Sequence, residues 1–451
     1  MKRIRGLFSG DGVKARALTG SFWTIANYGG ENLMRLASNL VLTRLLFPEA
    51  FGMMAIVQVM IAGLKMFSDT GIATSIMQHE RGDDPDFLNT AWTMQVARGV
   101  MLWLATCAIA LPVANIYNEP MLAQLLPVAG LNAIIGGLQP TASHSANRHL
   151  RLGLMTRISL FVQLVAIILM IVLAWLTESV WALVLGGLVG GVLRNFLFRK
   201  LLPGVPSRFR WDPTAARELF HFGKYIFLST AFGFVVNYAD RAILGGYISM
   251  AELGVYNIAF FLASVPFMIA EMLTRRVVMP LYRMRPMVGN PRNQKHIFRV
   301  RRTLIGVGLL GNAILAFGGV FFVDFMYDDR YALAGPFVVL LSLVFVPRIV
   351  VVGSGAVLLA QGDSKRFLYL VGSLAIVQTI FLFLAISRFG IVGAIIAPGV
   401  GILVTAPLRI LYARRYDAWD GIAQTLFLTV GLALGGLACW LHWSEISVLF
   451  G

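Results

Sequence analysis

The sequence predicts an all-α polytopic membrane protein: two six-helix bundles around a central cavity, with a thirteenth helix at the C-terminus. Three observations lead to this fold class. Hydrophobic residues make up 58% of the 451 residues and charged residues only 13%, whereas a soluble domain carries about 25% charged residues. The apolar residues gather in segments long enough to cross a bilayer. The basic residues concentrate in alternate connections between these segments, as expected for a membrane protein of fixed orientation.

The first half of the chain begins with a basic tail, residues 1–17, which we expect to be cytoplasmic. Six apolar segments then form the predicted N-terminal bundle, residues 18–198; they lie at about 18–46, 51–75, 90–111, 122–139, 156–176 and 180–198. The first two are joined by a tight turn at Phe47–Ala50. Residues 199–218, a basic stretch that includes Pro203 and Pro206, form the predicted cytoplasmic linker.

The second half repeats this organisation. The predicted C-terminal bundle covers residues 219–412, with segments at about 219–239, 253–274, 304–327, 332–360, 366–387 and 391–412. Residues 413–451 hold the thirteenth segment, about 422–441. At an offset of 202 residues, Leu42, Gly52 and Ile56 fall on Leu244, Gly254 and Ile258. Six spans per copy preserve orientation, so such a repeat is parallel, with its axis along the membrane normal.

The basic residues predict the orientation. With the N-terminus inside, 30 of the 38 lysines and arginines lie in inside segments, 4 in outside turns and 4 at membrane depth. This asymmetry predicts a cytoplasmic N-terminus. It also assigns the net charge of +16 to cytoplasmic loops, so that nucleic acid is not an expected partner. Cys107 and Cys439 lie in apolar segments and are expected to serve as small packing residues.

Charges at membrane depth predict a wet cavity. The basic ones are Arg35, Lys65, Arg98 and Arg348, and the acidic ones are Glu31 and Asp69. A charge at this depth costs roughly 2.5–3.5 kcal/mol or more, so it usually faces a protein interior or water. The sum of the deep charges is +2, which favours an anionic guest, and the arginine guanidinium suits phosphate oxygens. The four basic residues are therefore the candidate substrate-binding residues.

Structural alternatives stay open for these charges. Arg35 follows Glu31, and Asp69 follows Lys65, by four residues, so each pair can neutralise itself on one helix face. The other reading makes Glu31 and Asp69 ion-binding or gating residues. Arg98 and Arg348 have no opposite charge within one turn and are the better anion contacts, although Arg98 can also snorkel to the interface.

Two other charged regions have similar alternatives. Asp240 and Arg241, at the outer end of the seventh segment, form either a gate or an interfacial salt bridge. The basic loop 275–303 is either a topology determinant held near anionic lipid or a docking site for an enzyme. No P-loop, HExxH motif or cysteine–histidine metal spacing occurs, so we expect no enzyme activity, no metal and no cofactor. Transport would then use an ion gradient, the membrane potential or the gradient of the substrate.

Several runs resemble a known family. LTRLLFPEAFGMMAI, FSDTGIATSIMQ and LNTAWTMQVARG look like the N-terminal signature of the polysaccharide-type lipid flippases, and NYADRAILGGYISMAELGVYNIA looks like the start of their second half. These flippases share a superfamily with multidrug exporters and lipid II flippases. The resemblance covers roughly residues 15–415. The thirteenth segment departs from the twelve-helix members, which leaves the side of the C-terminus open.

The resemblance implies alternating access and a lipid-linked substrate. It implies that an undecaprenyl-pyrophosphate-type oligosaccharide moves to the outer leaflet of the bacterial inner membrane, for exopolysaccharide or lipopolysaccharide assembly. It also implies that Arg35, Arg98 and Arg348 contact the pyrophosphate and that polysaccharide assembly enzymes are further partners.

Two other functions are weighed against this one. A cation-coupled multidrug exporter of the same superfamily would need an acidic cavity, which the sum of +2 disfavours. A membrane-bound glycosyltransferase or polymerase would need surface carboxylates and large outer loops, whereas the outer turns here are short.

Overall fold

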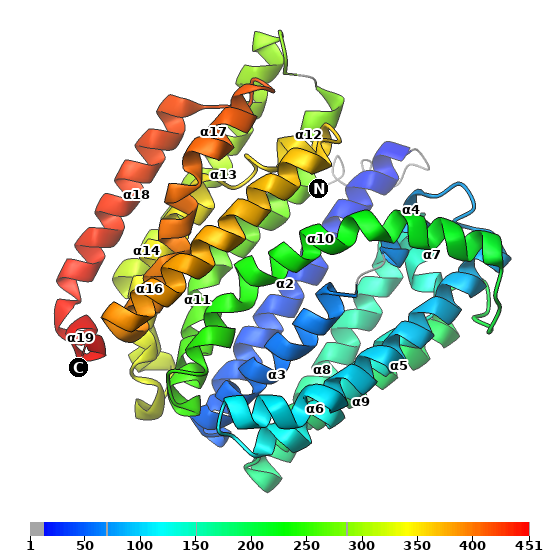
Figure 1. Ribbon diagram of the computed structural model, residues 1–451, viewed down its shortest axis with the longest axis horizontal. Helices are drawn as coiled ribbons and strands as arrows, with labels where there is room; N and C mark the ends of the chain where they lie inside the picture. The colour runs from blue at the N-terminus through cyan, green and yellow to red at the C-terminus, as the bar shows by residue number, and fades with distance from the viewer. Residues whose placement is uncertain (1–12, 69–70, 150, 286, 451) are drawn as a thin grey trace, which may run out of the picture. The chain divides into compact units, whose positions relative to one another are not determined.

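The computed structural model describes residues 13–68, 71–149, 151–285 and 287–450, and every regular element in these ranges is a helix (Figure 1). Within them, nine helices are long and apolar enough to cross a membrane. A tenth span results if α6 (Met121–Gly137) and α7 (Ala142–Arg148), which are bent by 59°, count as one broken helix. The prediction of an all-α multi-pass membrane protein is confirmed. Most of the predicted N-terminal tail lies outside the described residues.

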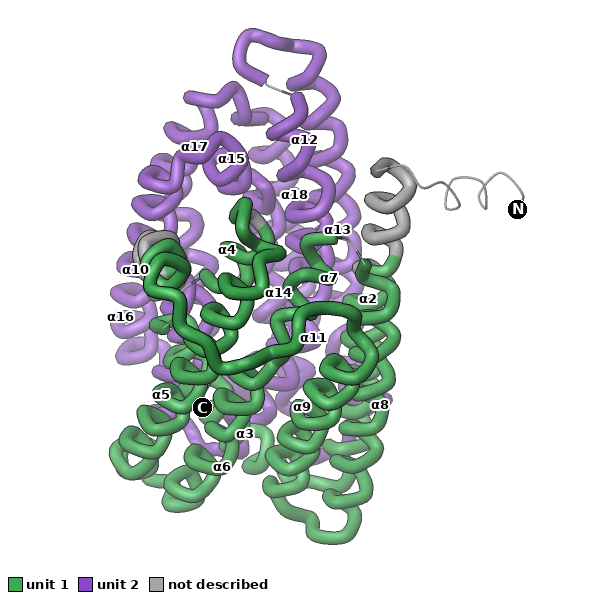
Figure 2. Tube along the Cα trace, turned by 90° about the vertical axis from the view of Figure 1, so that its right-hand side faces the viewer, with its two compact units in different colours: residues 1–231 green, residues 232–451 purple. Residues whose placement is uncertain are grey.

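The chain forms two compact units, which Figure 2 shows in different colours: unit 1, Met1–Ala231, and unit 2, Phe232–Gly451. Besides α6 and α7, unit 1 contains α2 (Val13–Leu45), α3 (Pro48–Met66), α4 (Ile72–Gln78), α5 (Pro85–Ile116), α8 (Leu152–Thr177) and α9 (Trp181–Leu201). The boundary between the units falls inside α10 (Pro213–Leu244). The finer division proposed from the sequence, with its tail, linker and C-terminal region, stays a prediction.

Unit 2 continues with longer helices and several short ones. These are α11 (Met250–Leu273), the π-helical turn η1 (Thr274–Val278), α12 (Met279–Met284), α13 (Pro291–Met326), the 3₁₀ turn η2 (Asp329–Tyr331), α14 (Ala334–Val350), α15 (Ala356–Ala360), α16 (Ser364–Val404), α17 (Ala406–Arg414), α18 (Gly421–Leu441), α19 (Trp443–Ser447) and the 3₁₀ turn η3 (Val448–Phe450).

Several predicted boundaries are corrected. α3 begins at Pro48, inside the predicted turn, because proline lacks an N–H and suits the first turn of a helix. The predicted segment 51–75 ends at Met66, and the separate helix α4 begins at Ile72. The predicted segment 332–360 is also divided, since α14 ends at Val350 and the short helix α15 follows.

α16 contains two antiparallel spans, as the sequence predicted. Gly390 interrupts it with φ 55° and ψ −139°, a backbone conformation that suits glycine because it has no side chain. A Cβ added to Gly393 would lie 2.3 Å from Ala385 O. Residues eight apart in a straight helix are about 12 Å apart, so the chain folds back on itself at Gly390.

The two units share one order of helices. The 202-residue offset takes Pro48, the first residue of α3, to Met250, the first residue of α11. In unit 1, α5 packs on α6, α3 on α6 and α8 on α9. In unit 2, α13 packs on α14 and α11 on α14, and the two parts of α16 lie against each other. These packings fit the predicted parallel repeat.

The core of unit 2 is organised around α14. All of its residues except Leu343 and Arg348 are buried, and it packs against α11, α13, α16 and α18. By contrast, Phe321 and Phe325 on α13 are 75% and 72% exposed, as expected for side chains that face lipid. α14 therefore carries Arg348 on a helix whose other residues, except Leu343, are buried in the core of unit 2.

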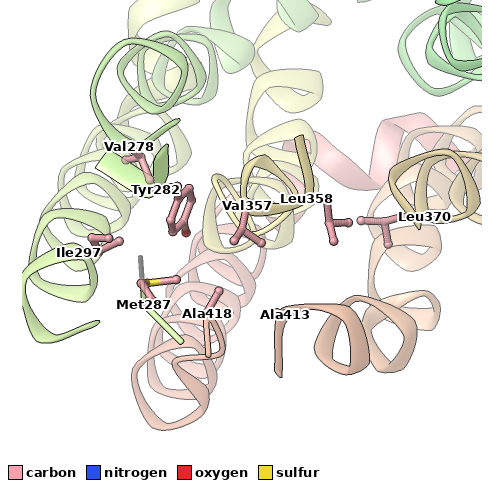
Figure 3. Packing of buried hydrophobic residues seen from close by; sticks show 9 residues of the cluster. All are labelled: Val278, Tyr282, Met287, Ile297, Val357, Leu358, Leu370, Ala413 and Ala418. Carbon is pink, nitrogen blue, oxygen red and sulfur yellow. The ribbon is translucent and has the colours of Figure 1, made fainter. Parts of the chain in front are cut away.

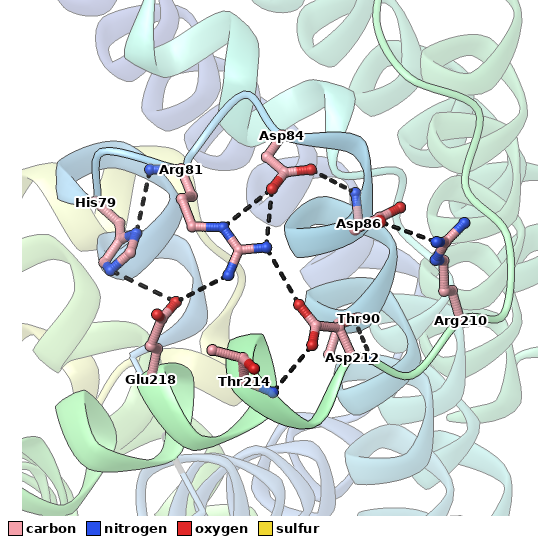
Figure 4. A network of polar contacts seen from close by, with 9 residues as sticks. All are labelled: His79, Arg81, Asp84, Asp86, Thr90, Arg210, Asp212, Thr214 and Glu218. Carbon is pink, nitrogen blue, oxygen red and sulfur yellow. Dashed lines mark hydrogen bonds and ion pairs between the residues drawn. The ribbon is translucent and has the colours of Figure 1, made fainter.

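In unit 1, the chain before α10 is bound to α5. The backbone N–H groups of Arg208 and Asp212 donate to Asn89 Oδ1 and Thr90 Oγ1, at 2.8 and 3.0 Å. Arg81 joins the same regions (Figure 4): its guanidinium lies 2.8 Å from Asp84 Oδ2 and 3.1 Å from Asp212 Oδ2. The segment that precedes α10 is therefore packed against α5 by hydrogen bonds and ion pairs.

α5 and α6 pack closely because glycines face each other. A Cβ on Gly99 would lie 2.6 Å from Ala133 O, and one on Gly137 would lie 2.8 Å from Gln95 O. Gln95 Nε2 also donates to Gly136 O at 3.0 Å. The small residues thus allow the two backbones to approach, as at other membrane helix interfaces.

We predict that Gly99→Ala destabilises the protein, because the added methyl group collides with main-chain atoms that cannot move away. The expected cost is about 1–3 kcal/mol, although alanine is by itself the better helix former by about 1 kcal/mol. The midpoint of thermal unfolding in detergent should fall by a few degrees. Gly136→Ala is the control, since a Cβ there has no neighbour within 4 Å. Equal midpoints for the two variants would contradict the close packing.

We also predict that the contribution of Arg81 to stability depends on pH. The N–H of Asp86 and the Arg81 guanidinium lower the pKa of Asp84 from 3.8, and the N–H of Thr214 and Arg81 lower the pKa of Asp212 from the same value. A carboxylate with a lowered folded pKa stabilises the fold fully above its unfolded pKa, and this stabilisation is lost as the pH falls through the folded value.

Arg81→Gln should therefore lower the thermal midpoint at neutral pH, and its difference from the wild type should shrink once the pH falls below 3.8. The control is Arg217→Gln, an exposed arginine of α10 with no ion pair in the described ranges. A difference that stays constant down to the acid limit would rule out these ion pairs as its source.

Candidate functional site

Unit 1 holds three of the four predicted substrate-binding residues. Arg35 lies on α2, Lys65 in the last turn of α3 and Arg98 on α5; the first two are exposed and Arg98 is half-buried. Glu31 accepts a hydrogen bond from Asn27 Nδ2 at 2.9 Å. Asp69, the predicted partner of Lys65, lies outside the described residues.

Arg98 binds the C-terminal end of α3. Its Nη2 donates to Lys65 O at 2.7 Å and its Nε donates to Ser68 Oγ at 3.0 Å. The last carbonyls of a helix have no partner within the helix and carry partial negative charge. Arg98 therefore stabilises this end of α3 and places its own charge beside Lys65, which the sequence alone did not predict.

Arg194 is a functional candidate that the sequence analysis missed. It lies on α9 with an exposed side chain, and Arg194 and Arg98 are both close enough to Lys65 to act on it electrostatically. We call Lys65, Arg98 and Arg194 the basic cluster. In the count of basic residues above, Arg194 was one of the 30 assigned to inside segments. The apolar residues that follow it in α9 indicate instead that the span continues past it.

The basic cluster suits an anion. Its three side chains come from three different helices, so the fold and not the local sequence brings their charges together. Like charges repel one another, and the repulsion is stronger where water is reduced. An anionic group among them relieves this repulsion, and arginine can meet phosphate oxygens with two parallel N–H groups.

Arg348 belongs to unit 2 and is held by main-chain and aromatic contacts. Its Nη2 donates to Val236 O on α10 at 3.1 Å. Its guanidinium carbon lies 5.8 Å from the ring centre of Phe267 and 5.7 Å from that of Phe345, within range of cation–π attraction. Gln378 Nε2 donates to the same Val236 carbonyl at 3.2 Å.

Asp240 and Arg241 lie near Arg348. Asp240 is only 4% exposed and accepts a hydrogen bond from the hydroxyl of Tyr256 at 2.9 Å. Arg241 Nε is 3.7 Å from Asp240 Oδ1, and its guanidinium lies 4.0 Å from the ring centre of Phe260. Asp240 and Arg241 also act electrostatically on Arg348.

We call Asp240, Arg241, Tyr256, Arg348 and Gln378 the polar network of unit 2. The prediction from the sequence placed Arg348 and the Asp240–Arg241 pair in separate sites, whereas the fold of unit 2 brings them close together. Asp240 Oδ1 and Gln378 Oε1 are buried with no hydrogen-bond partner in the described part of the chain. The predicted binding and gating roles of these residues stay predictions, as does the prediction that the deep charges of both units line one cavity.

Comparison with protein families and curated relatives gives consistent results. A family model described as "Polysaccharide biosynthesis protein" matches residues 41–300. The teichuronic acid biosynthesis protein TuaB of Bacillus subtilis is 18% identical, over 71% of this chain and 66% of its own length. The succinoglycan biosynthesis transport protein ExoT of Rhizobium meliloti is 22% identical, over 77% of this chain and 72% of its own length. For the lipopolysaccharide biosynthesis protein WzxC of Escherichia coli, 22% identity extends over 60% of this chain and 55% of that protein.

Solved structures share the fold. The lipid II flippase MurJ, in an inward closed conformation, superposes with a TM-score of 0.71 at 10% identity, covering 94% of this chain and 98% of MurJ. An inward-facing multidrug resistance transporter of the MATE family gives a TM-score of 0.62 at 13% identity, covering 86% of this chain and 94% of that transporter. At these identities the likeness concerns the fold alone. The family model matches more than half of the length of this chain, at residues 41–300. This chain therefore belongs to the polysaccharide biosynthesis protein family.

Proposed function

We propose that this protein is a flippase that moves polyprenyl-pyrophosphate-linked oligosaccharides across the bacterial inner membrane by alternating access, for exopolysaccharide or lipopolysaccharide assembly. The family membership and the names of the relatives, which include a succinoglycan transport protein, support this proposal. The observation that carries it is the basic cluster of unit 1: Arg98 of α5 donates to Lys65 O and Ser68 Oγ at the end of α3, which sets its charge beside Lys65, and Arg194 of α9 acts on Lys65 electrostatically.

The pyrophosphate is the part of such a substrate that a bilayer excludes most strongly, because it is charged. Lys65 and Arg194 are exposed within unit 1, and Arg98 is oriented by its bonds to the end of α3. A pre-oriented guanidinium loses little freedom when it binds an anion, which favours affinity. The polyprenyl chain would stay in the bilayer while the basic cluster holds the pyrophosphate.

The polar network of unit 2 has a separate role in this proposal. Asp240 is the best supported of the ion or gating candidates, Glu31, Asp69, Asp240 and Arg241, because its Oδ1 is buried with no hydrogen-bond partner among the described residues. A buried carboxylate oxygen of this kind can accept a proton or a cation, and Arg241 and Tyr256 are placed to respond to that change. Arg348 fixes α14 to α10 beside it.

The proposal includes the orientation and the class of activity. The cytoplasmic N-terminus is supported by the concentration of lysine and arginine in alternate loops. The protein acts as a transporter without a catalytic step, and its cargo reaches it from the enzymes that assemble the lipid-linked sugar. A multidrug exporter shares the fold, but a basic cluster suits an anionic cargo better than a cationic one.

We predict that Arg98→Ala lowers polymer export about 10-fold to 100-fold, because a hydrogen bond to a charged group contributes about 1.5–3 kcal/mol. Arg98→Lys should restore part of the export if charge alone matters, and little if two parallel hydrogen bonds are required. Arg35→Ala should also reduce export. The measurement is complementation of a deletion strain, scored by exported polymer and by accumulated lipid-linked sugar. The amount of each variant in the membrane is the control for folding.

Full complementation by both alanine variants, Arg98→Ala and Arg35→Ala, would rule out the proposal that these arginines bind the pyrophosphate during export. A deletion strain that exports normal polymer but becomes sensitive to cationic drugs would instead favour the multidrug exporter.

We predict that Arg194→Ala weakens the binding of geranylgeranyl pyrophosphate to the full-length protein in nanodiscs about tenfold, because one of three attractive charges is lost. Arg199→Ala is the matched control: it is an exposed arginine of the same helix, and it lies outside the basic cluster. Geranylgeraniol, which lacks the pyrophosphate, should bind both variants equally. Equal loss of affinity in both arginine variants would show a general charge effect and not a site.

A further inference from the structure

One end of unit 2 carries a folded extension with its own apolar core. The cap, as we call it, consists of residues 274–285, 287–303, 351–370 and 411–420. Its core, shown in Figure 3, is built from Val278, Tyr282, Met287, Ile297, Val357, Leu358, Leu370, Ala413 and Ala418. These residues come from parts of the chain far apart in sequence, so the cap is a tertiary structure and not a set of independent loops.

Hydrogen bonds join the same segments. Arg301 Nη1 donates to Ala418 O at 2.8 Å, and Arg301 is itself buried. Arg302 forms two hydrogen bonds with the Asp420 carboxylate, at 2.7 and 2.8 Å. The hydroxyl of Tyr282 donates to Gly353 O at 3.2 Å. A loop that served only to set topology would need the charges but not this core.

The turn between α12 and α13 projects beyond the membrane. α13 has 36 residues and is about 54 Å long, whereas the hydrocarbon core of a bilayer is about 30 Å thick. The exposed Phe321 and Phe325 place the lipid-facing part at the C-terminal end of α13. The excess of about 24 Å therefore belongs to the N-terminal end, and it extends about 15 Å beyond the headgroups. Figure 2 shows this turn at the extremity of unit 2.

The surface of the cap has an excess of positive charge. Exposed basic residues with no ion pair in the described part of the chain are Arg276, Arg283, Arg285, Arg292, Lys295, Arg299, Lys365, Arg414 and Arg415. The acidic residues nearby are already engaged: Asp420 with Arg302, Asp363 with Arg366, and Asp417 with the N–H of Gly289.

Apolar side chains lie among the charges at the turn. Met284 is 77% exposed and Val288 is 63% exposed. We call Arg283, Met284, Arg285, Val288, Arg292 and Lys295 the tip patch. Exposed aliphatic groups and arginines that are interspersed in one turn match the composition of surfaces that bind other proteins, in which arginine and methionine are enriched.

The position of the tip patch excludes the headgroups of the protein's own bilayer as its partner. Electrostatic attraction is screened over about 8 Å at physiological ionic strength, which is less than the distance of about 15 Å to the headgroups. None of the six residues is aromatic, so the patch lacks the stacking surface that single-stranded nucleic acids require.

We propose that the tip patch is the docking surface for an acidic face of another protein. Arg283, Arg285 and Arg292 pair with carboxylates of this partner, and Met284 and Val288 enter an apolar cleft between them. This inference goes beyond the proposed transport function, and it uses residues outside both the basic cluster and the polar network.

The test combines cross-linking with measured binding. Benzoylphenylalanine replaces Met284 in the full-length protein in native membranes, and Phe321, exposed on the lipid-facing part of α13, is the control position. A nuclease-resistant protein adduct is expected at position 284 only. The cross-linked protein is then purified, and its affinity for the full-length protein in phosphatidylcholine nanodiscs is measured. The triple variant Arg283→Gln, Arg285→Gln, Arg292→Gln should bind it at least tenfold more weakly.

A matched triple variant, Lys365→Gln, Arg414→Gln, Arg415→Gln, removes three exposed charges of the same cap and should bind like the wild type. Equal weakening in both triple variants, the absence of an adduct at position 284, or an adduct to lipid or RNA would overturn the proposal. Both variants should still bind geranylgeranyl pyrophosphate, so this result is separable from failure of the proposed transport function.

Discussion

The structure depends on one constraint: a half-buried arginine among membrane helices must find a hydrogen-bond partner within the protein. Arg98 and Arg348 meet it in the same way, by donating to main-chain carbonyls of a neighbouring helix, Lys65 O and Val236 O. Such a bond satisfies the guanidinium and at the same time fixes the position of the second helix. A residue that looks like a pure binding group in the sequence thus also holds the fold together.

The two roles of Arg98, as a charge and as a link between helices, determine the arrangement of the candidate site. Because Arg98 is held by the end of α3, its charge is placed beside Lys65, and Arg194 from α9 adds to it. These like charges repel one another, and an anion placed among them would reduce the repulsion, which is the basis of the proposed binding of an anionic cargo. In unit 2, Asp240, Tyr256 and Arg241 form the opposite arrangement, a buried carboxylate with a hydroxyl and a cation beside it. The two units repeat one helix order but differ in the chemistry that they enclose.

The ends of the helices differ from the spans, because within the described residues they carry most of the hydrogen bonds and ion pairs between side chains. The spans have little polar surface, whereas the N-terminal end of α13 continues beyond the bilayer and joins α12, α15 and the end of α17 in a cap with its own core. In this cap, Arg301 donates to Ala418 O and Arg302 donates to the Asp420 carboxylate. In unit 1, the Arg81 network ties the segment before α10 to α5 in a similar way.

The sequence by itself determined the class of the protein and the sign of the net charge carried by its apolar segments. Apolar length depends on the bilayer, which acts on every segment alone, so each of the thirteen predicted segments contains helix, although 51–75 and 332–360 are each divided by a break. Within the described residues, nine helices are long and apolar enough to cross a membrane, or ten if the bent pair α6–α7 counts as one span. Hydropathy measures the apolar length of a segment and carries little information about its local backbone conformation. The sequence therefore could not determine where a helix breaks within such a segment, for example the end of α3 at Met66. It also could not determine which charges meet. Lys65, Arg98 and Arg194 lie on three helices, and Asp240 and Arg348 on two, so only the packing of whole helices brings them within reach of each other.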